Sequence, residues 1–131
     1  MIEPLSVTVL VVDDDPIVRD IYTLALQRAG FKVLVAADGI SALQAVSDAR
    51  PDFVFLDIKM PRMDGIEVLR QLQAAEATRA IPVVMMSNFD DPGFVKESSR
   101  LGAKQYCVKT SVSPTGLGAI VRTWLAPDQA T

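Results

Sequence analysis

Five short apolar runs rich in β-branched residues recur along the chain, and patterns typical of helices lie between them. The runs are Val7–Val12, Phe31–Ala36, Phe53–Leu56, Val83–Met86 and Tyr106–Val108. The central runs lack the polar alternation of a strand with one solvated face, so we expect helices on both faces of the sheet. This pattern predicts an α/β fold with a doubly wound, five-stranded parallel sheet in the order 2-1-3-4-5.

Start and stop signals support helices between the runs. Asp15 is placed to cap the first helix, Pro16 to occupy its first turn, and Gly30 to follow its end. This helix carries three apolar residues on one face, namely Ile17, Ile21 and Leu24. Similar signals occur at Asp91-Pro92 with Gly102, at Ser113-Pro114, and near Gly39 and Gly65, where Asp64 would be the cap of the helix.

The size of the chain predicts a single domain over residues 1–131, with a core from about residue 7 to residue 125. Hydrophobic residues make up 50% of the sequence, charged residues 22%, and the net charge is −3. No basic run suggests nucleic-acid binding, and Val7–Val12 is too short for a membrane span or a secretion signal. We therefore expect a cytoplasmic protein with no direct nucleic-acid contact and no membrane insertion. Met1–Ser6 and Ala126–Thr131 resemble loose ends.

Cysteine and histidine usage narrows the chemistry that the chain can perform. The single cysteine, Cys107, excludes an internal disulfide, and its apolar surroundings indicate a buried small side chain. The sequence contains no histidine. This absence excludes histidine acid–base catalysis, histidine metal ligands and a phosphohistidine carried by this chain.

Aspartates follow two of the apolar runs. Asp13 and Asp14 come after the first run, and Asp57 ends the third. In the predicted order these strands are neighbours, and ligands of such sheets bind outside the C-terminal strand ends. Like charges about 5 Å apart at an effective dielectric near 20 repel by roughly 3 kcal/mol, so the cluster needs a cation or a proton. Oxygen ligands in an open crevice suit Mg²⁺, and Mn²⁺ could substitute for it.

Two more polar residues end the fourth and fifth runs. Ser87 would supply a hydroxyl group and Lys109 a positive charge at the same crevice. A carboxylate can accept a phosphoryl group as an acyl phosphate while a metal and a lysine neutralise the transferring oxygens. Asp57 is the candidate nucleophile because it ends the central strand, whereas Asp14 leads into a helix and is better placed as a metal ligand.

The chain therefore carries four spaced motifs, which are Val11-Val12-Asp13-Asp14, Leu56-Asp57 through Met63-Asp64-Gly65, Ser87, and Lys109. In their order and spacing it resembles the receiver domain of the response-regulator family, the phosphorylatable part of two-component signalling. The similarity covers nearly all of residues 7–125. It implies a flavodoxin-like (βα)5 fold and a stand-alone receiver of the chemotaxis-like type.

The resemblance also implies roles for the site residues. Asp57 would be the phosphoacceptor, and Lys109 would contact the phosphoryl group. Mg²⁺ would be held by Asp14, Asp57 and the backbone carbonyl of Lys59, with Asp13 assisting through water. These assignments make the chain a phosphoacceptor that assists its own phosphorylation and dephosphorylation, not an enzyme in the ordinary sense.

A switch and its partners follow from the same resemblance. Ser87 and Tyr106 match the pair that rearranges when the phosphoryl group is bound, which would change binding to a downstream protein target. The phosphoryl donor would be a histidine kinase or a histidine phosphotransfer protein. The readout face would contain Phe94, Lys96, Gln105, Tyr106 and the last helix. Because Gln105 stands where an acidic residue is usual, we expect a monomer or at most a weak dimer.

Two positions depart from the family pattern, and two further residues flank the approach to Asp57. Thr110 follows the lysine, where proline in a cis peptide is usual; a cis bond without proline costs roughly 3 kcal/mol, so we expect a trans bond or a rearranged loop. Asn88 occupies a position that is commonly very small. Lys59 and Phe89 flank the path to Asp57, and we hypothesise that they obstruct water and lengthen the life of the acyl phosphate.

Three alternatives stay open. A phosphatase of the haloacid dehalogenase type also uses an aspartate nucleophile and Mg²⁺, but it needs a second aspartate two positions on, where this chain has Lys59. A phosphorylation-independent, receiver-like interaction module is the second alternative, suggested by Asn88 and Thr110. The third is a receiver fragment of a longer regulator with an effector domain, because the polar residues 127–131 would suit a linker as well as a terminus.

Overall fold

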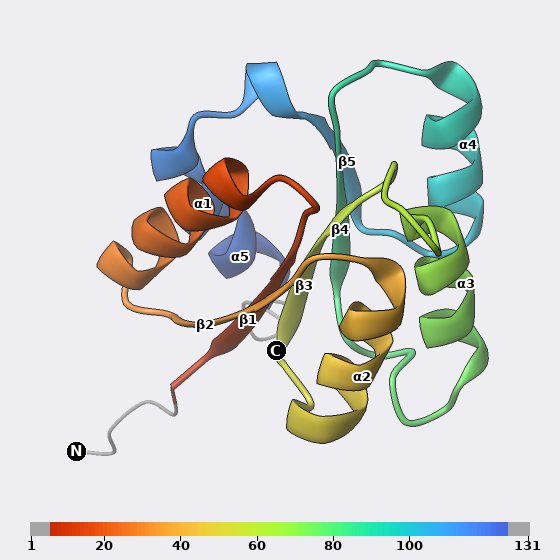
Figure 1. Ribbon diagram of the computed structural model, residues 1–131, viewed down its shortest axis with the longest axis horizontal. Coiled ribbons are helices and arrows are strands. Elements are labelled where there is room, and N and C mark those ends of the chain that lie inside the picture. The colour runs from red at the N-terminus through yellow and green to blue at the C-terminus, as the bar shows by residue number, and fades with distance from the viewer. Residues whose placement is uncertain (1–5, 126–131) are drawn as a thin grey trace, which may run out of the picture.

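A computed structural model, which describes residues 6–125, confirms the predicted sheet (Figure 1). Its five parallel strands are β1 (Thr8–Val12), β2 (Lys32–Ala36), β3 (Phe53–Asp57), β4 (Val83–Ser87) and β5 (Gln105–Val108). They lie in the order β2-β1-β3-β4-β5, so the strands β1 and β3 are hydrogen-bonded neighbours. Residues 1–5 and 126–131, which carry most of the predicted loose ends and the candidate linker, lie outside the described part.

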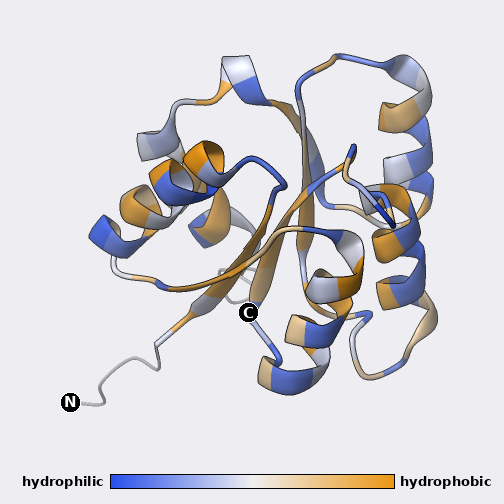
Figure 2. Ribbon diagram, viewed as in Figure 1, coloured by the Kyte–Doolittle hydropathy of each residue, from blue (hydrophilic) through white to orange (hydrophobic). Residues whose placement is uncertain are grey.

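Helices cover both faces of the sheet, as the uninterrupted apolar strands predict. They are α1 (Pro16–Arg28), α2 (Gly39–Ala49), α3 (Gly65–Ala74), α4 (Pro92–Arg100) and α5 (Leu117–Leu125). Helices α1 and α5 lie on one face, and α2, α3 and α4 lie on the other (Figure 1). Each face has its own apolar core, and Figure 2 shows the apolar residues concentrated along the strands and the inner helix faces. Every residue of β3 and β4 is buried.

The helix caps follow the sequence signals closely. The side chains of Asp15, Asp64 and Asp91 each accept a hydrogen bond from a backbone N–H in the first turn of α1, α3 and α4. Gly30 and Gly102 follow helices with φ of 100° and 95°, a conformation that glycine adopts without strain. Asp38, which the sequence analysis did not single out, caps α2 in the same way.

One face of α1 differs from the expectation for an amphipathic helix. Ile17, Ile21 and Leu24 do share a face, but this face is open to solvent, with 68%, 46% and 49% of each residue exposed. The buried residues of α1 are instead Tyr22 and Leu26. The helix therefore carries two apolar stripes, and only one of them packs on the sheet.

The last helix begins differently from the prediction. A short 3₁₀ turn, Pro114–Gly116, precedes α5, and Ser113 makes no capping hydrogen bond to the backbone. Its hydroxyl group instead pairs with that of Thr115. The Ser113-Pro114 signal thus marks the start of this turn, and α5 follows it. Within residues 6–125, no helix has the length and apolar character needed to cross a membrane.

Gly65 is where the loop after β3 passes close to the strand end. The Gly65 N–H donates a hydrogen bond to the carbonyl oxygen of Ile58 at 2.7 Å. A Cβ atom at this position would lie 2.1 Å from the backbone oxygen of Asp57. The absence of a side chain at Gly65 therefore allows α3 to start directly beside the end of β3.

We expect Gly65→Ala to lower the free energy of unfolding by about 1–3 kcal/mol, because the new methyl group meets backbone atoms that cannot move aside easily. The measurement is urea denaturation at equilibrium. Gly116→Ala is the matched control, since its Cβ would meet nothing closer than the Ser113 hydroxyl at 3.6 Å. Equal stability of the Gly65→Ala variant and the wild type would contradict this account of the loop.

Candidate functional site

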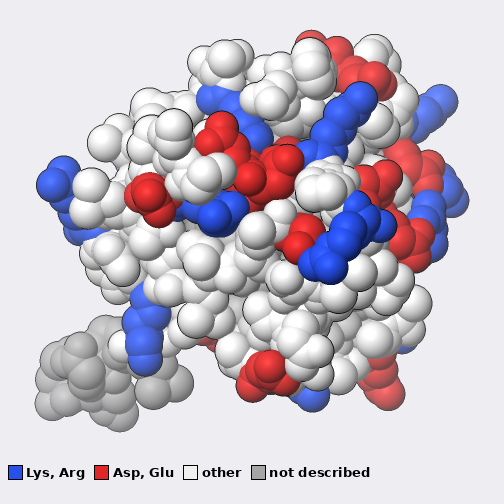
Figure 3. All heavy atoms as spheres, viewed as in Figure 1, with Lys and Arg blue, Asp and Glu red and all other residues white. Residues whose placement is uncertain are grey.

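Three carboxylates converge at the C-terminal edge of the sheet. Val12 of β1 pairs in register with Leu56 of β3, so the next residues, Asp13 and Asp57, come side by side. Asp14 joins them, and one carboxylate oxygen from each of the three lies within 4.8 Å of the others. Figure 3 shows acidic side chains gathered above the central strands with basic side chains beside them.

The three aspartates differ in burial and in their hydrogen bonds. Asp13 and Asp57 are 2% and 5% exposed, whereas Asp14 is open to solvent. The Asp13 side chain accepts a hydrogen bond from the Asp15 N–H at 2.9 Å. The Arg19 guanidinium donates to the Asp13 backbone carbonyl at 2.8 Å. Both bonds fix the acidic loop between β1 and α1.

Lys109 reaches into this cluster from the end of β5. Its Nζ atom lies 2.6 Å from Asp13 Oδ2 and 3.3 Å from Asp57 Oδ2. No cis peptide bond occurs among the described residues, so the bond to Thr110 is trans, and Lys109–Ser111 form a 3₁₀ turn. The missing proline therefore does not prevent the lysine from entering the crevice.

The cluster brings three carboxylates together with one ammonium group, so negative charge is in excess. Burial, the largest cause, and the negative charge of Asp13 together raise the pKa of Asp57 to about 7, although the ammonium of Lys109 acts in the opposite direction. Burial would lower the pKa of Lys109, but its hydrogen bond to Asp13 and the charges of Asp57 and Asp13 outweigh burial and raise it. A hard divalent cation with oxygen ligands fits this donor set, because it would relieve the repulsion among the carboxylates.

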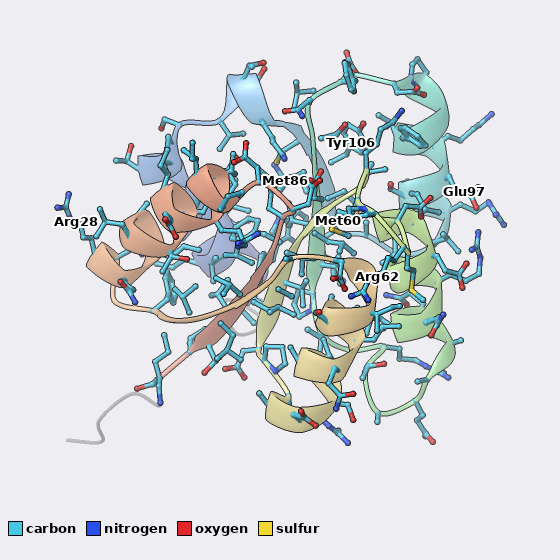
Figure 4. The ribbon with its side chains drawn as sticks, in the orientation of Figure 1. Arg28, Met60, Arg62, Met86, Glu97 and Tyr106 are labelled. Carbon is cyan, nitrogen blue, oxygen red and sulfur yellow. The ribbon has the colours of Figure 1, made fainter. Side chains whose placement is uncertain are left out.

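Ser87 and Tyr106 both contact the backbone of Phe89, in the loop between β4 and α4. The Phe89 N–H donates to the buried Ser87 hydroxyl oxygen at 3.1 Å. The Tyr106 hydroxyl group donates to the Phe89 carbonyl oxygen at 2.7 Å, and Figure 4 shows Tyr106 near this loop. The two predicted switch residues are therefore joined through one residue of this loop.

Lys59 is exposed to solvent, but its ammonium lies beside two aromatic rings. Its Nζ atom lies 5.8 Å from the centre of the Phe89 ring and 5.7 Å from that of the Phe94 ring. The sequence analysis placed Lys59 and Phe89 beside the path to Asp57 but did not connect them with Phe94. It also missed Arg19, since contact with a backbone carbonyl leaves no signal in the sequence. Asn88 is exposed.

Comparison with known proteins decides the family. The model of the "Response regulator receiver domain" family matches residues 9–122, which is most of the chain. The chain belongs to this family. The buried Cys107, 4% exposed, is a small core residue of the receiver fold, as predicted, and burial raises the pKa of its thiol.

Relatives of known name agree with this assignment. The receiver is 40% identical over 117 residues to the DNA-binding response regulator MtrA of Mycolicibacterium smegmatis, a match that covers 89% of the chain and 50% of MtrA. The chain thus spans about half the length of the MtrA proteins it matches. It is 35% identical over 113 residues to Protein PilG of Pseudomonas aeruginosa, covering 86% of the chain and 83% of PilG.

A solved structure shows the same fold. The chemotaxis response regulator CheY4 of Vibrio cholerae is 31% identical and superposes with a TM-score of 0.84. The alignment covers 92% of the receiver described here and 99% of the CheY4 chain. Receivers of this kind are signalling switches and not enzymes of the ordinary type.

The raised pKa of Asp57 gives a pH dependence of stability. The group has a pKa of about 7 in the folded protein and an ordinary value of 3.8. Its contribution is therefore fully present below pH 3.8 and is lost as the pH rises through about 7. Without metal, we expect Asp57→Asn to gain stability relative to the wild type as the pH rises from 3.8 to about 7, because the amide cannot ionise.

The measurement is urea denaturation in a chelating buffer at several pH values. Asp20→Asn, which removes an exposed carboxylate on α1, is the control for the change in net charge. A stability difference between Asp57→Asn and the wild type that does not change over this range would show that Asp57 is already ionised at low pH.

Proposed function

We propose that the receiver is a phosphoacceptor switch in which Asp57 is the acceptor. The observation that carries the proposal is the convergence of the buried Asp57 with Asp13, Asp14 and the Lys109 ammonium at one strand edge. An Asp57 carboxylate oxygen attacks the phosphorus of a partner's phosphohistidine. The phosphorus–oxygen bond forms, the phosphorus–nitrogen bond breaks, and the imidazole of the partner keeps the electron pair of the broken bond.

The residues of the cluster would share the work of charge neutralisation. Asp13, Asp14, Asp57 and the backbone carbonyl of Lys59 would hold Mg²⁺, and Mn²⁺ could replace it. When bound, the ion would supply positive charge next to the transferring oxygens. Lys109 supplies a second positive charge from the turn that follows β5, and the low exposure of Asp57 limits the access of water to the acyl phosphate.

Phosphorylation of Asp57 would rearrange the loop between β4 and α4. The Ser87 hydroxyl group would donate to a phosphoryl oxygen and give up its bond to the Phe89 N–H. The Phe89 carbonyl would then move, Tyr106 would lose its acceptor, and its ring would turn inward. These movements would alter the surface of α4, β5 and α5, where a downstream protein would bind.

The same surface supports the proposal of a monomer or weak dimer. Gln105 accepts a hydrogen bond from the Trp124 indole N–H at 2.7 Å, so its side chain is engaged within the receiver. A hollow of about 270 Å³ lies nearby between α4 and β5, lined by Val95, Ser98, Ser99, Ala103, Lys104, Gln105 and Tyr106. A downstream target is a better occupant of this face than a second copy, because Gln105 offers no charge for a symmetric ion pair.

The phosphoryl donor would be a histidine kinase or a histidine phosphotransfer protein. The exposed apolar face of α1 supports docking of such a partner, because α1 begins directly after Asp14 and Asp15 at the crevice. Ile17 is the exposed apolar residue nearest this start. The single-domain organisation over residues 1–131, the stand-alone type and the cytoplasmic location stay predictions.

Two alternatives are weighed against this function. A phosphatase of the haloacid dehalogenase type is disfavoured, because Lys59 stands where a second aspartate would be needed and its ammonium lies beside two aromatic rings. A phosphorylation-independent module would bind its target equally well after Asp57→Ala. The convergence of the buried Asp13 and Asp57 with Lys109 favours the phosphoacceptor over this module.

We expect incubation with acetyl phosphate and Mg²⁺ to add one phosphoryl group to the protein, measured by intact mass. Excess chelator should prevent the addition, and so should Asp57→Asn, because both remove a part of the reaction centre. Asp48→Asn, an exposed carboxylate on α2, is the matched control and should be phosphorylated like the wild type. If neither acetyl phosphate nor beryllofluoride binds, the phosphorylation-independent module is the better description.

We further expect Lys59→Ala and Phe89→Ala to shorten the life of the acyl phosphate several-fold, because our hypothesis is that both side chains obstruct the path of water to Asp57. The measurement is the rate of phosphate release after the donor has been removed. Unchanged rates in both variants would show that neither side chain obstructs the attacking water.

A further inference from the structure

The ammonium of Lys59, an exposed residue, lies within cation–π distance of two aromatic rings that come from different parts of the chain. Phe89 lies in the loop between β4 and α4, and Phe94 lies in the first turns of α4. The Lys59 Nζ atom is 5.8 Å from the first ring centre and 5.7 Å from the second, within the range of cation–π attraction. We call Lys59, Phe89 and Phe94 the aromatic bracket.

The two rings differ in how firmly they are anchored. Phe89 is 58% exposed, and its backbone is held by Ser87 and by the Tyr106 hydroxyl group. Phe94 is partly buried and packs against the core on the α4 side of the sheet. Among residues 6–125, Lys59 forms no ion pair with a carboxylate. The rings are therefore the electrostatic partners of its ammonium within the described residues.

A phosphoryl group on Asp57 would compete for this ammonium. Lys59 follows Asp57 by two residues, and phosphorylation would bring up to two negative charges to the same strand end. An anion of this charge attracts an ammonium more strongly than two partly exposed ring faces do. The bracket would consequently open when the phosphoryl group arrives.

We propose that Phe94 is a positioning residue for Lys59, and that the aromatic bracket holds the Lys59 ammonium toward α4 until the phosphoryl group draws it away. The proposal rests on Asp57 being the phosphoacceptor. It links the start of α4 to the phosphorylation site through Lys59, in addition to the path through Ser87 and Tyr106. The closed bracket stabilises the unphosphorylated state and so opposes modification of Asp57.

The test is a double-mutant cycle on beryllofluoride binding in the presence of Mg²⁺, followed by amide NMR shifts. Phe94→Leu keeps an apolar side chain but removes the ring face, so it should bind beryllofluoride about two- to fivefold more tightly, the equivalent of one exposed cation–π contact. Phe94→Tyr keeps the ring face and should match the wild type. In a Lys59→Met background, Phe94→Leu should have no effect on affinity.

A second measurement follows the bracket directly. Ring currents should shift the Lys59 ε-methylene protons upfield in the unphosphorylated protein, and beryllofluoride should return them toward their usual position. Urea denaturation of Phe94→Leu checks that the variant remains folded. The proposal is wrong if Phe94→Leu binds like the wild type, if the same gain occurs with Lys59→Met, or if the Lys59 protons show no upfield shift. Failure of the wild type to bind beryllofluoride would instead contradict the proposed function, and the opening of the bracket with it.

Discussion

The ion pairs of Lys109 hold together a cluster that would otherwise repel itself. One ammonium faces Asp13 at 2.6 Å and Asp57 at 3.3 Å, while Asp14 adds a third carboxylate nearby. One positive charge against three negative ones leaves a deficit, and burial raises the cost of that deficit because water cannot screen it. The raised pKa of Asp57 and the fit of a divalent cation are therefore two consequences of one imbalance.

The rigidity of the sheet beneath the cluster determines which segments can rearrange when the charge of the cluster changes. Every residue of β3 and β4 is buried, and a packed core does not deform gradually. Rearrangement is easier in the segments above the strand ends, where hydrogen bonds join side chains to loop backbone. The loop around Phe89 is such a segment, since its hydrogen bonds with Ser87 and Tyr106 both involve hydroxyl groups that are able to rotate.

The sequence predicted the strands, their order and three of the capping aspartates, Asp15, Asp64 and Asp91, because each depends on a strong local pattern or on a general rule of parallel sheets. The positions of Asp57 and Lys109 followed from the strand ends alone. The solvent-exposed apolar face of α1 could not be predicted, because the sequence of a helix with two apolar stripes does not show which stripe packs on the sheet. The position of the Lys59 side chain could not be predicted either. A long flexible side chain is positioned by contacts with residues such as Phe94 that are distant in the sequence.

Phe89 takes part in both of the proposed routes from the crevice to α4. Its ring faces Lys59, and its carbonyl accepts the Tyr106 hydroxyl group. If phosphorylation displaces this residue, then a protein that binds α4 and β5 and displaces it in the same direction must favour phosphorylation, because coupling free energies are reciprocal. A downstream target would then prolong or promote the modified state without touching Asp57. Under this proposal, binding at the output surface and modification at the acceptor site would be coupled, because both would bias the position of the loop around Phe89.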